Sequence, residues 1–243
     1  MIENAKTVIA NWWRVWRYYK SHWQNLRFFF SLTAVKFFVT WFAIAPIFVK
    51  VLEKLPPEIA VSINEKSYSI VLQLPFSWVL LWVASFVFTI ALLIYYIRCP
   101  DFIKTNPSFS VFKDEQHSPR WLCWLLYYSW TGSAQQEKLA ERLTEKRLAE
   151  RVYDLDEKYF KPQVEQRGTV WRFSHNSETY EVCIPTDLDE ETQREYFWEI
   201  FGRWSSSQPR VRTVIWMLIL VAIVIVLYVV YENIRFVLTY LLS

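Results

Sequence analysis

The chain has 243 residues and contains three glycines against 14 Trp, 14 Tyr and 18 Phe. Its formal net charge is +3, and 53% of its residues are hydrophobic. So few glycines exclude phosphate-binding loops of the Walker or dinucleotide type, which need several glycines close together. They also count against an all-β protein with many tight turns, because glycine usually fills the positions of positive φ. The composition therefore predicts a helix-rich protein.

Residues 1–27 form a basic and aromatic segment with no continuous apolar run and no signal-peptide cleavage site. Tryptophan interleaved with arginine is typical of a helix in the headgroup layer, where rings lie at the interface and cations meet anionic lipid. Single-stranded nucleic acid is the competing ligand for this pattern. Because an apolar segment follows directly, we favour a juxtamembrane helix. Its predicted interface residues are Trp12, Trp13, Arg14, Trp16 and Arg17.

Residues 28–97 are predicted to form a transmembrane hairpin of two spans joined by a short outer loop at 50–66. About 20 apolar residues, at 1.5 Å each, cross a hydrocarbon layer of roughly 30 Å. Residues 67–97 contain no charge, whereas the run at 28–49 is interrupted by Lys36, whose long stem can reach the nearer membrane face. Lys36 and Gln73 are the polar residues that we expect inside the membrane.

Residues 213–243 are predicted to form a third span, uncharged from 213 to 231, and a short outer tail. The alternative for these uncharged runs is a buried core helix, but helices of this length without a polar face are rare in soluble proteins. The spans contain no acid that could pair with Lys36. We therefore expect neither a proton relay nor an ion-coupled carrier.

The charges that flank the spans predict their orientation. Residues 1–27 carry a net charge of +4, whereas the loop at 50–66 is neutral. The positive-inside rule then places the N-terminus in the cytoplasm and this loop outside. Arg98 after the second span, and Arg210 and Arg212 before the third, would also lie at the cytoplasmic interface.

Residues 98–212 carry a net charge of −2 and are predicted to form a small cytosolic α+β domain. The uncharged helix at 121–130 is too short to span a membrane, so it is a core helix or an interfacial helix, and we favour a helix lying against the membrane or the spans. In chain order we expect an irregular segment at 98–118, the uncharged helix, a charged helix from 133 to about 152, a hairpin with strands at 169–173 and 179–184, and a helix from 187 to 201 that stops at Gly202.

Residues with catalytic or metal-binding potential are scattered, at His22, Cys99, His117, Cys123, His175 and Cys183. The cysteines have no zinc-site spacing and are expected to be free thiols. The acids within 187–191 could hold a divalent cation, but their position favours a role as helix-start charges. We expect no enzyme, no cofactor, no metal and no small-molecule substrate. An enzyme at the membrane surface that uses His117, His175 or these acids is the least favoured hypothesis.

The apolar segments at 28–52 and 67–97, and the sequence RCPDFIKTNPSF that follows them, resemble the small membrane effectors of bacterial anti-phage systems. These include effectors encoded beside retron reverse transcriptases, and the resemblance covers mainly residues 1–130. It implies a toxin-like protein of abortive infection, kept inactive by a partner complex, that permeabilises the membrane when infection is sensed. The implied location is the bacterial inner membrane, with residues 1–27 and 98–212 cytoplasmic and the C-terminus periplasmic.

The resemblance also implies partners. Besides membrane lipids, these are a protein or ribonucleoprotein sensor, which would be a reverse transcriptase with its nucleic acid in a retron-type system. Three spans enclose no pore, so conduction would need a homo-oligomer. The alternative function is that of a non-catalytic accessory or scaffold subunit of a membrane complex.

Overall fold

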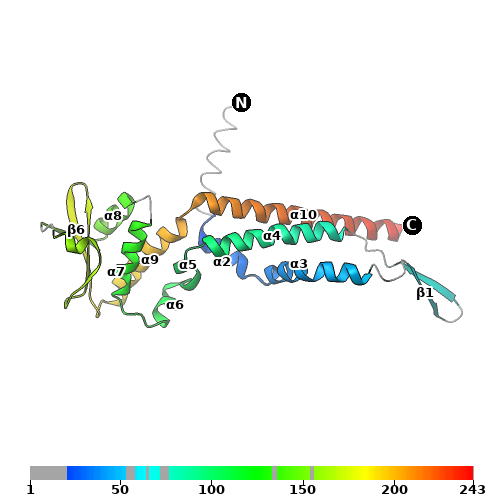
Figure 1. Ribbon diagram of the computed structural model, residues 1–243, viewed down its shortest axis with the longest axis horizontal. Coiled ribbons are helices and arrows are strands. Elements are labelled where there is room, and N and C mark those ends of the chain that lie inside the picture. Colours follow the sequence, from blue (N-terminus) through cyan, green and yellow to red (C-terminus); the bar gives the residue numbers. More distant parts are fainter. Residues whose placement is uncertain are drawn as a thin grey trace, which may run out of the picture. The chain divides into compact units, whose positions relative to one another are not determined.

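A computed structural model describes residues 21–52, 58–63, 66–71, 77–132, 136–153 and 156–242 (Figure 1). The chain divides into two compact units, which are described separately below. The helical unit contains the described parts of residues 25–98 and 209–242, together with residue 21. The inserted unit contains residues 22–24 and the described parts of 99–208. The main part of the inserted unit is thus residues 99–208, whereas the domain expected from the sequence was 98–212.

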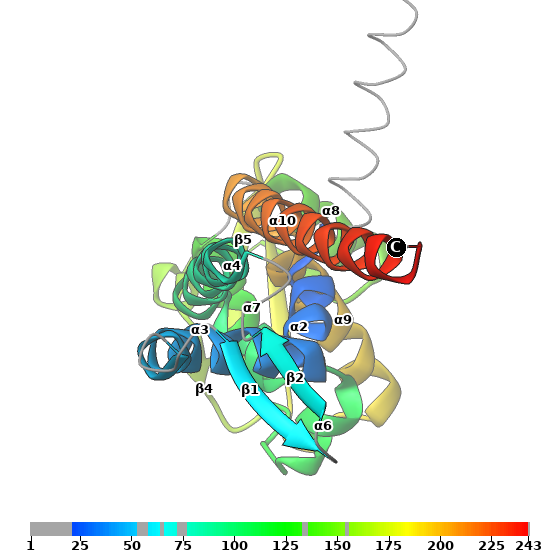
Figure 2. The ribbon, with the colours of Figure 1, turned by 90° about the vertical axis from the view of Figure 1, so that its right-hand side faces the viewer.

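Long apolar helices build the helical unit: α2 (Trp23–Ser31), α3 (Thr33–Leu52), α4 (Trp78–Arg98) and α10 (Pro209–Leu242). Helix α4 lies between α3 and α10 (Figure 2). By length and composition, α4 and α10 are long and apolar enough to cross a membrane. A third span is present if the bent pair α2 and α3 counts as one. A mainly helical fold with two or three such helices is therefore confirmed.

The predicted run at 28–49 is not one continuous helix, because the chain bends by 61° between α2 and α3. At the bend, the amide of Leu32 donates to the carbonyl of Phe29 and the amide of Val35 to that of Leu32. The Ser31 hydroxyl donates to the Phe28 carbonyl at 2.7 Å. These backbone hydrogen bonds span three residues instead of the four of an α-helix, and the Ser31 hydroxyl competes for a backbone carbonyl. Both are recognised causes of helix bends.

Helix α10 continues well beyond the predicted end of the third span at residue 231. Glu232 and Arg235 end the uncharged run, but neither residue ends a helix, and no Gly or Pro follows them. The part of the predicted outer tail that the structure describes is therefore helical to Leu242.

The region between α3 and α4 contains a hairpin that the sequence analysis missed. Strand β1 (Glu58–Ile63) pairs antiparallel with β2 (Lys66–Val71). The predicted loop at 50–66 is therefore partly helix and partly strand, and α4 begins only at Trp78. Val, Ile and Tyr alternate with Ser and Ala in both strands, a pattern that favours β-structure over helix.

The inserted unit contains an antiparallel sheet in the order β3-β6-β5-β4. Its strands are β3 (Glu150–Val152), β4 (Gln163–Val164), β5 (Thr169–His175) and β6 (Glu178–Ile184). The predicted hairpin is confirmed as β5 and β6. Asn176 and Ser177 join these strands with φ of 50° and 63°, as a two-residue turn of type I′ requires.

Helices pack on this sheet and on one another: α5 (Asp101–Thr105), α6 (Phe109–Asp114), α7 (Trp121–Thr131), α8 (Gln136–Glu145) and α9 (Glu190–Ser206), with a 3₁₀ turn, η1 (Glu157–Phe160). Trp130 of α7 contacts Trp171 and Phe173 of β5, with ring centroids 5.6 and 5.0 Å apart. Phe197 of α9 contacts Phe102, which lies in α5. Aromatic contacts thus supply much of the core.

Several expectations for this unit were wrong. The segment at 98–118 contains α5 and α6 rather than irregular chain. The charged helix ends at Glu145, because Arg147 takes a left-handed φ of 57° and the chain then forms β3. Helix α9 passes through Gly202 and ends at Ser206.

Helix α7 is a core helix of the inserted unit and does not need a membrane to cover its apolar side. Leu122, Cys123 and Leu126 lie on one face and are fully buried. That face contacts β5, β6 and α9. The core alternative is therefore confirmed for this face of α7, while Trp121 and Tyr128 of the same helix are exposed.

Two glycines of the inserted unit provide a stability test. A Cβ at Gly168, where φ is 154°, would lie 2.7 Å from the carbonyl oxygen of Ile184, whereas a Cβ at Gly202 in α9 meets nothing within 4 Å. We expect Gly168→Ala to lower the free energy of unfolding by about 1–3 kcal/mol. Gly202→Ala should raise it by about 0.5–1 kcal/mol, because alanine favours helix. Thermal unfolding of the full chain in detergent measures both, and a stabilising Gly168→Ala would contradict the turn geometry.

Candidate functional site

The predicted membrane-interface residues of the N-terminal segment lie outside the described residues, and so does the predicted in-membrane residue Gln73. These are Trp12, Trp13, Arg14, Trp16 and Arg17 together with Gln73. The remaining predicted residues are Lys36, Arg98, Arg210 and Arg212, and the structure places all four in the helical unit.

The surface of α10 between Arg212 and Glu232 is apolar on every side. Exposed positions in this interval carry only aliphatic, Met and Tyr side chains, at Val214, Met217, Leu220, Val221, Ile223, Val224, Leu227, Tyr228, Val230 and Tyr231. Ile215, Ile219 and Ala222, at helical spacing, are buried on the side that packs against α4. Twenty residues separate Arg212 from Glu232, which corresponds to about 30 Å of helix. This length equals the thickness of a hydrocarbon layer.

Glu232 marks the far end of this apolar interval. Its Oε2 accepts a hydrogen bond from the backbone amide of Ser77, 3.4 Å away, directly before α4 begins. A carboxylate at this position also interacts favourably with the positive end of the α4 dipole. Helices α4 and α10 are therefore antiparallel neighbours (Figure 1). The sequence contains no local signal for this contact, because 155 residues separate its partners.

The hydroxyl groups of Ser85 and Thr89 in α4 are satisfied inside their own helix. The Ser85 hydroxyl donates to the Leu81 carbonyl at 3.0 Å, and the Thr89 hydroxyl donates to the Ser85 carbonyl at 2.7 Å. Such bonds let hydroxyl side chains lie in apolar surroundings without an unmet hydrogen bond. These groups therefore mark no polar path along α4.

Two of the predicted interface arginines are exposed. Arg98 ends α4 and Arg210 lies in the first turn of α10. Because α4 and α10 are antiparallel, both guanidinium groups belong to the same end of the helical unit, as the predicted topology requires. Lys36 is also exposed, on α3, four positions after the bend at Leu32.

Arg212 differs from the other predicted interface residues, because it is buried with 3% of its surface exposed. One of its guanidinium nitrogens donates to the carbonyl of Ser21 at 2.9 Å. Arg212 therefore fixes the segment before α2 to the first turns of α10. Its guanidinium group thus has a partner inside the helical unit.

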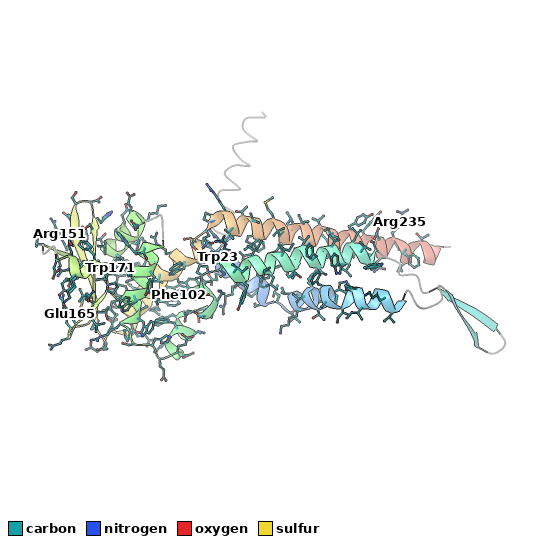
Figure 3. The ribbon with its side chains drawn as sticks, in the orientation of Figure 1. Trp23, Phe102, Arg151, Glu165, Trp171 and Arg235 are labelled. Carbon is teal, nitrogen blue, oxygen red and sulfur yellow. The ribbon has the colours of Figure 1, made fainter. Side chains whose placement is uncertain are left out.

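Trp23 is a buried residue that sequence reasoning missed. Its indole nitrogen donates to the carbonyl of Ser207 at 3.1 Å and lies 3.2 Å from the Ser207 hydroxyl. Both residues belong to the inserted unit, and Trp23 is fully buried (Figure 3 labels its position). The basic and aromatic composition around it suggested an interfacial residue, so no local pattern distinguished it from its neighbours.

A charged network lies on the sheet of the inserted unit. Glu181 accepts a hydrogen bond from Arg172 at 2.8 Å and forms an ion pair with Arg167 at 2.9 Å. The side chains of Arg172 and Glu181 are 7% and 8% exposed. The Arg172 guanidinium lies 4.3 Å from the ring centroid of Tyr159, which covers it. The Tyr159 hydroxyl donates to Glu165, which raises the pKa of the phenol and lowers that of the carboxyl group.

An open cavity of about 800 Å³ lies beside this network. Arg120, Val164, Glu165, Gln166 and Arg167 line it, and Arg120 donates to the Glu165 carbonyl at 3.3 Å. The lining contains both charge signs, an amide and an exposed valine. Such a surface fits a protein or peptide partner better than a polyanion that needs one sign of charge.

Of the scattered catalytic candidates, Cys123 and Cys183 lie near each other between α7 and β6, whereas His117 and Asp189 have local partners. His117 lies 3.1 Å from Glu115, and its ring packs beside Trp121. Asp189 caps α9 by accepting the Thr192 amide at 2.8 Å, and this bond lowers the pKa of its carboxyl group. The acids at 187–191 thus include a helix cap, as favoured from the sequence.

The described cysteines are free, and burial raises the pKa of Cys123 and of Cys183. A raised pKa keeps each thiol protonated and unreactive near neutral pH. Within the described ranges, no three His, Cys, Asp or Glu residues lie close enough together to hold a metal ion.

Comparison of the chain with protein-family models, with curated proteins and with solved structures gives no match. The assignment of function therefore depends on the arrangement described above. Two features carry it, namely the apolar exterior of α4 and α10 and the mixed-charge surface of the inserted unit.

The buried pair Arg172 and Glu181 gives a test of how the inserted unit is stabilised. We expect Glu181→Leu to cost about 3–5 kcal/mol, because it removes one partner of a buried, hydrogen-bonded ion pair. The double variant Arg172→Met with Glu181→Leu should recover most of this loss, since it removes both charges of the pair. Amide hydrogen exchange of β5 and β6 in the full chain measures both.

The matched control is Arg167→Ala, which removes the half-exposed partner of Glu181. This change should cost less than about 1 kcal/mol, since exposed ion pairs contribute little. A double variant as unstable as Glu181→Leu alone would show that the pair stabilises the sheet through more than charge compensation.

Proposed function

We propose that the chain is an integral protein of the bacterial inner membrane that acts as an effector of anti-phage defence. The observation that carries the membrane assignment is the uninterrupted apolar surface of α10 between Arg212 and Glu232. In water this surface would be an exposed apolar patch far larger than those of soluble monomers. In a bilayer it needs no cover, because lipid chains solvate it.

The proposed topology has three spans, α4, α10 and the bent pair of α2 and α3. The exposed residues Arg98 and Arg210 belong to the cytoplasmic end, and Glu232 to the periplasmic end. The positive-inside rule supports this direction, because the segments at 1–27 and around 210 are basic while the loop at 50–66 is neutral. Lys36 lies on α3, close to the bend between α2 and α3, and its aliphatic stem can extend toward the headgroups.

The inserted unit is the proposed docking module for the partner that keeps the effector inactive. Its cavity beside Arg120 and Arg167 combines charges of both signs with an exposed apolar residue, Val164. Such a surface supports binding of a protein, or of the protein component of a ribonucleoprotein sensor such as a reverse transcriptase with its nucleic acid. The net charge of −2 over 98–212 argues against nucleic acid as the main contact.

In the proposed mechanism, release from the partner lets the helices disturb the membrane and dissipate its potential. The described helices of one chain are packed through bulky aromatic rings, such as Phe38 on Phe88 at 5.0 Å. Conduction by such helices requires several copies, so the proposal includes a homo-oligomer in the active state. Without toxicity, the same architecture would serve an accessory subunit of a membrane complex.

Expression of the full chain alone in a bacterial host tests the effector function. We expect growth arrest together with loss of membrane potential and uptake of propidium. Val224→Arg should abolish these effects, because an arginine near the middle of the span costs about 2.5–3.5 kcal/mol on insertion. Val237→Arg is the matched control, since this valine is similarly exposed on the same helix but lies beyond Arg235.

The outcomes separate the membrane assignment from the effector assignment. Extraction of the wild-type chain by alkaline carbonate would overturn the membrane assignment. A chain that stays in the membrane but leaves growth and potential unchanged would overturn the effector assignment, and a stoichiometric membrane partner that co-purifies with it would favour the accessory subunit.

A further inference from the structure

The hairpin of β1 and β2 separates its residues by chemical character. Residues of a strand alternate between two faces, and directly paired residues share a face. The pairs Ile59 with Ile70, Val61 with Tyr68 and Ile63 with Lys66 therefore belong to one face, where five of six residues are large and apolar or aromatic. The other face carries Glu58 with Val71, Ala60 with Ser69 and Ser62 with Ser67.

Neither strand has an extensive contact with a described helix of the helical unit. Among the described elements, the extensive contacts of β1 and β2 are with each other. An isolated two-stranded hairpin is marginally stable in water and needs something to pack against its apolar face. The hairpin, drawn in cyan in Figure 2, is therefore a surface that requires a partner.

The positions where the hairpin joins the helices identify this partner. Five residues connect Leu52 of α3 to Glu58, and six connect Val71 to Trp78 of α4. At no more than about 3.6 Å per residue, the first and last residues of the hairpin stay within roughly 20–25 Å of the helix ends. The start of α4 lies beside Glu232, at the end of the apolar interval of α10. If α4 spans the bilayer as proposed, the membrane surface is always within reach.

We propose that the β1–β2 hairpin lies flat on the outer surface of the bilayer, with the face of Ile59, Val61 and Ile70 in contact with lipid. The inference rests on the proposed membrane function and adds a lipid-binding surface to it. A flat position at the interface satisfies both requirements of the hairpin. The apolar face leaves water, while the unpaired backbone groups of the two open edges keep water as a partner, which the hydrocarbon core cannot offer.

Tyr68 suits this position, because tyrosine is favoured where an apolar layer meets water. Charge contributes little, since Glu58 and Lys66 are the charged residues of the two strands and offset each other. Binding should therefore be insensitive to salt and to the fraction of anionic lipid, unlike that of a basic amphipathic helix.

Ser69 and Ile70 form a matched pair for the test, because they are neighbours on opposite faces of β2. A fluorescent amino acid is incorporated by nonsense suppression at position 69, 70 or 93 of the full chain, which leaves the native cysteines unlabelled. Each protein is reconstituted in vesicles of phosphatidylethanolamine and phosphatidylglycerol. Leu93 is exposed on α4 and reports whether the helix lies in the bilayer.

We expect nitroxides on the lipid acyl chains to quench positions 70 and 93 severalfold more than position 69. Iodide on both sides of the bilayer should quench position 69 severalfold more than position 70. Neither ratio should change between low and high salt.

Equal quenching at positions 69 and 70, with position 93 still lipid-quenched, would overturn this inference and leave the membrane anchor intact. Protection of position 70 from both quenchers, increasing with the protein-to-lipid ratio, would identify a second copy as the partner and also overturn it. Failure of lipid quenching at position 93 would instead overturn the membrane assignment itself.

Discussion

The apolar interval of α10 is the constraint on which the helical unit depends, and both of its ends are fixed by hydrogen bonds between a charged side chain and a backbone group. Arg212 donates to the carbonyl of Ser21 at one end. Glu232 accepts the amide of Ser77 at the other. Hydrogen bonds to charged groups are stronger than those between neutral groups. Arg212 and Glu232 mark the two ends of the apolar interval. The same two residues also fix the position of α10 along its axis, relative to Ser21 before α2 and Ser77 before α4.

The inserted unit is stabilised differently, by aromatic packing on one face of its sheet and a charged network on the other. Trp171 and Phe173 pack under α7, while Arg172, which lies between them in β5, pairs with Glu181. Alternation along one strand therefore separates the two environments. A rigid sheet of this kind holds the neighbouring loop at 165–168 in place, and such loops on rigid scaffolds commonly carry binding function.

The features that the sequence predicted are those with a local pattern. The uncharged runs gave α4 and α10, and alternating β-branched residues around turn-formers gave β5 and β6. The bend at Leu32 was missed because it depends on competing hydrogen bonds inside an apolar run. Trp23 and Glu232 were missed for another reason: their partners lie 184 and 155 positions away, so no window of sequence contains both.

Within the proposed effector, the helices of the helical unit are not held equally firmly. Helices α4 and α10 pack against each other along an extended contact and are tied at the Ser77–Glu232 end. The described contacts of α3 with α4 are aromatic stacks, such as Phe42 on Trp82 at 5.4 Å, and α3 also contains Pro46 and the exposed Lys36. Between helices in lipid, such stacks gain dispersion energy but no hydrophobic driving force. If the proposed effector rearranges its helices to disturb the membrane, α3 is therefore the helix that can move at the smallest cost in packing energy. The β1–β2 hairpin is the next element after α3 in the chain.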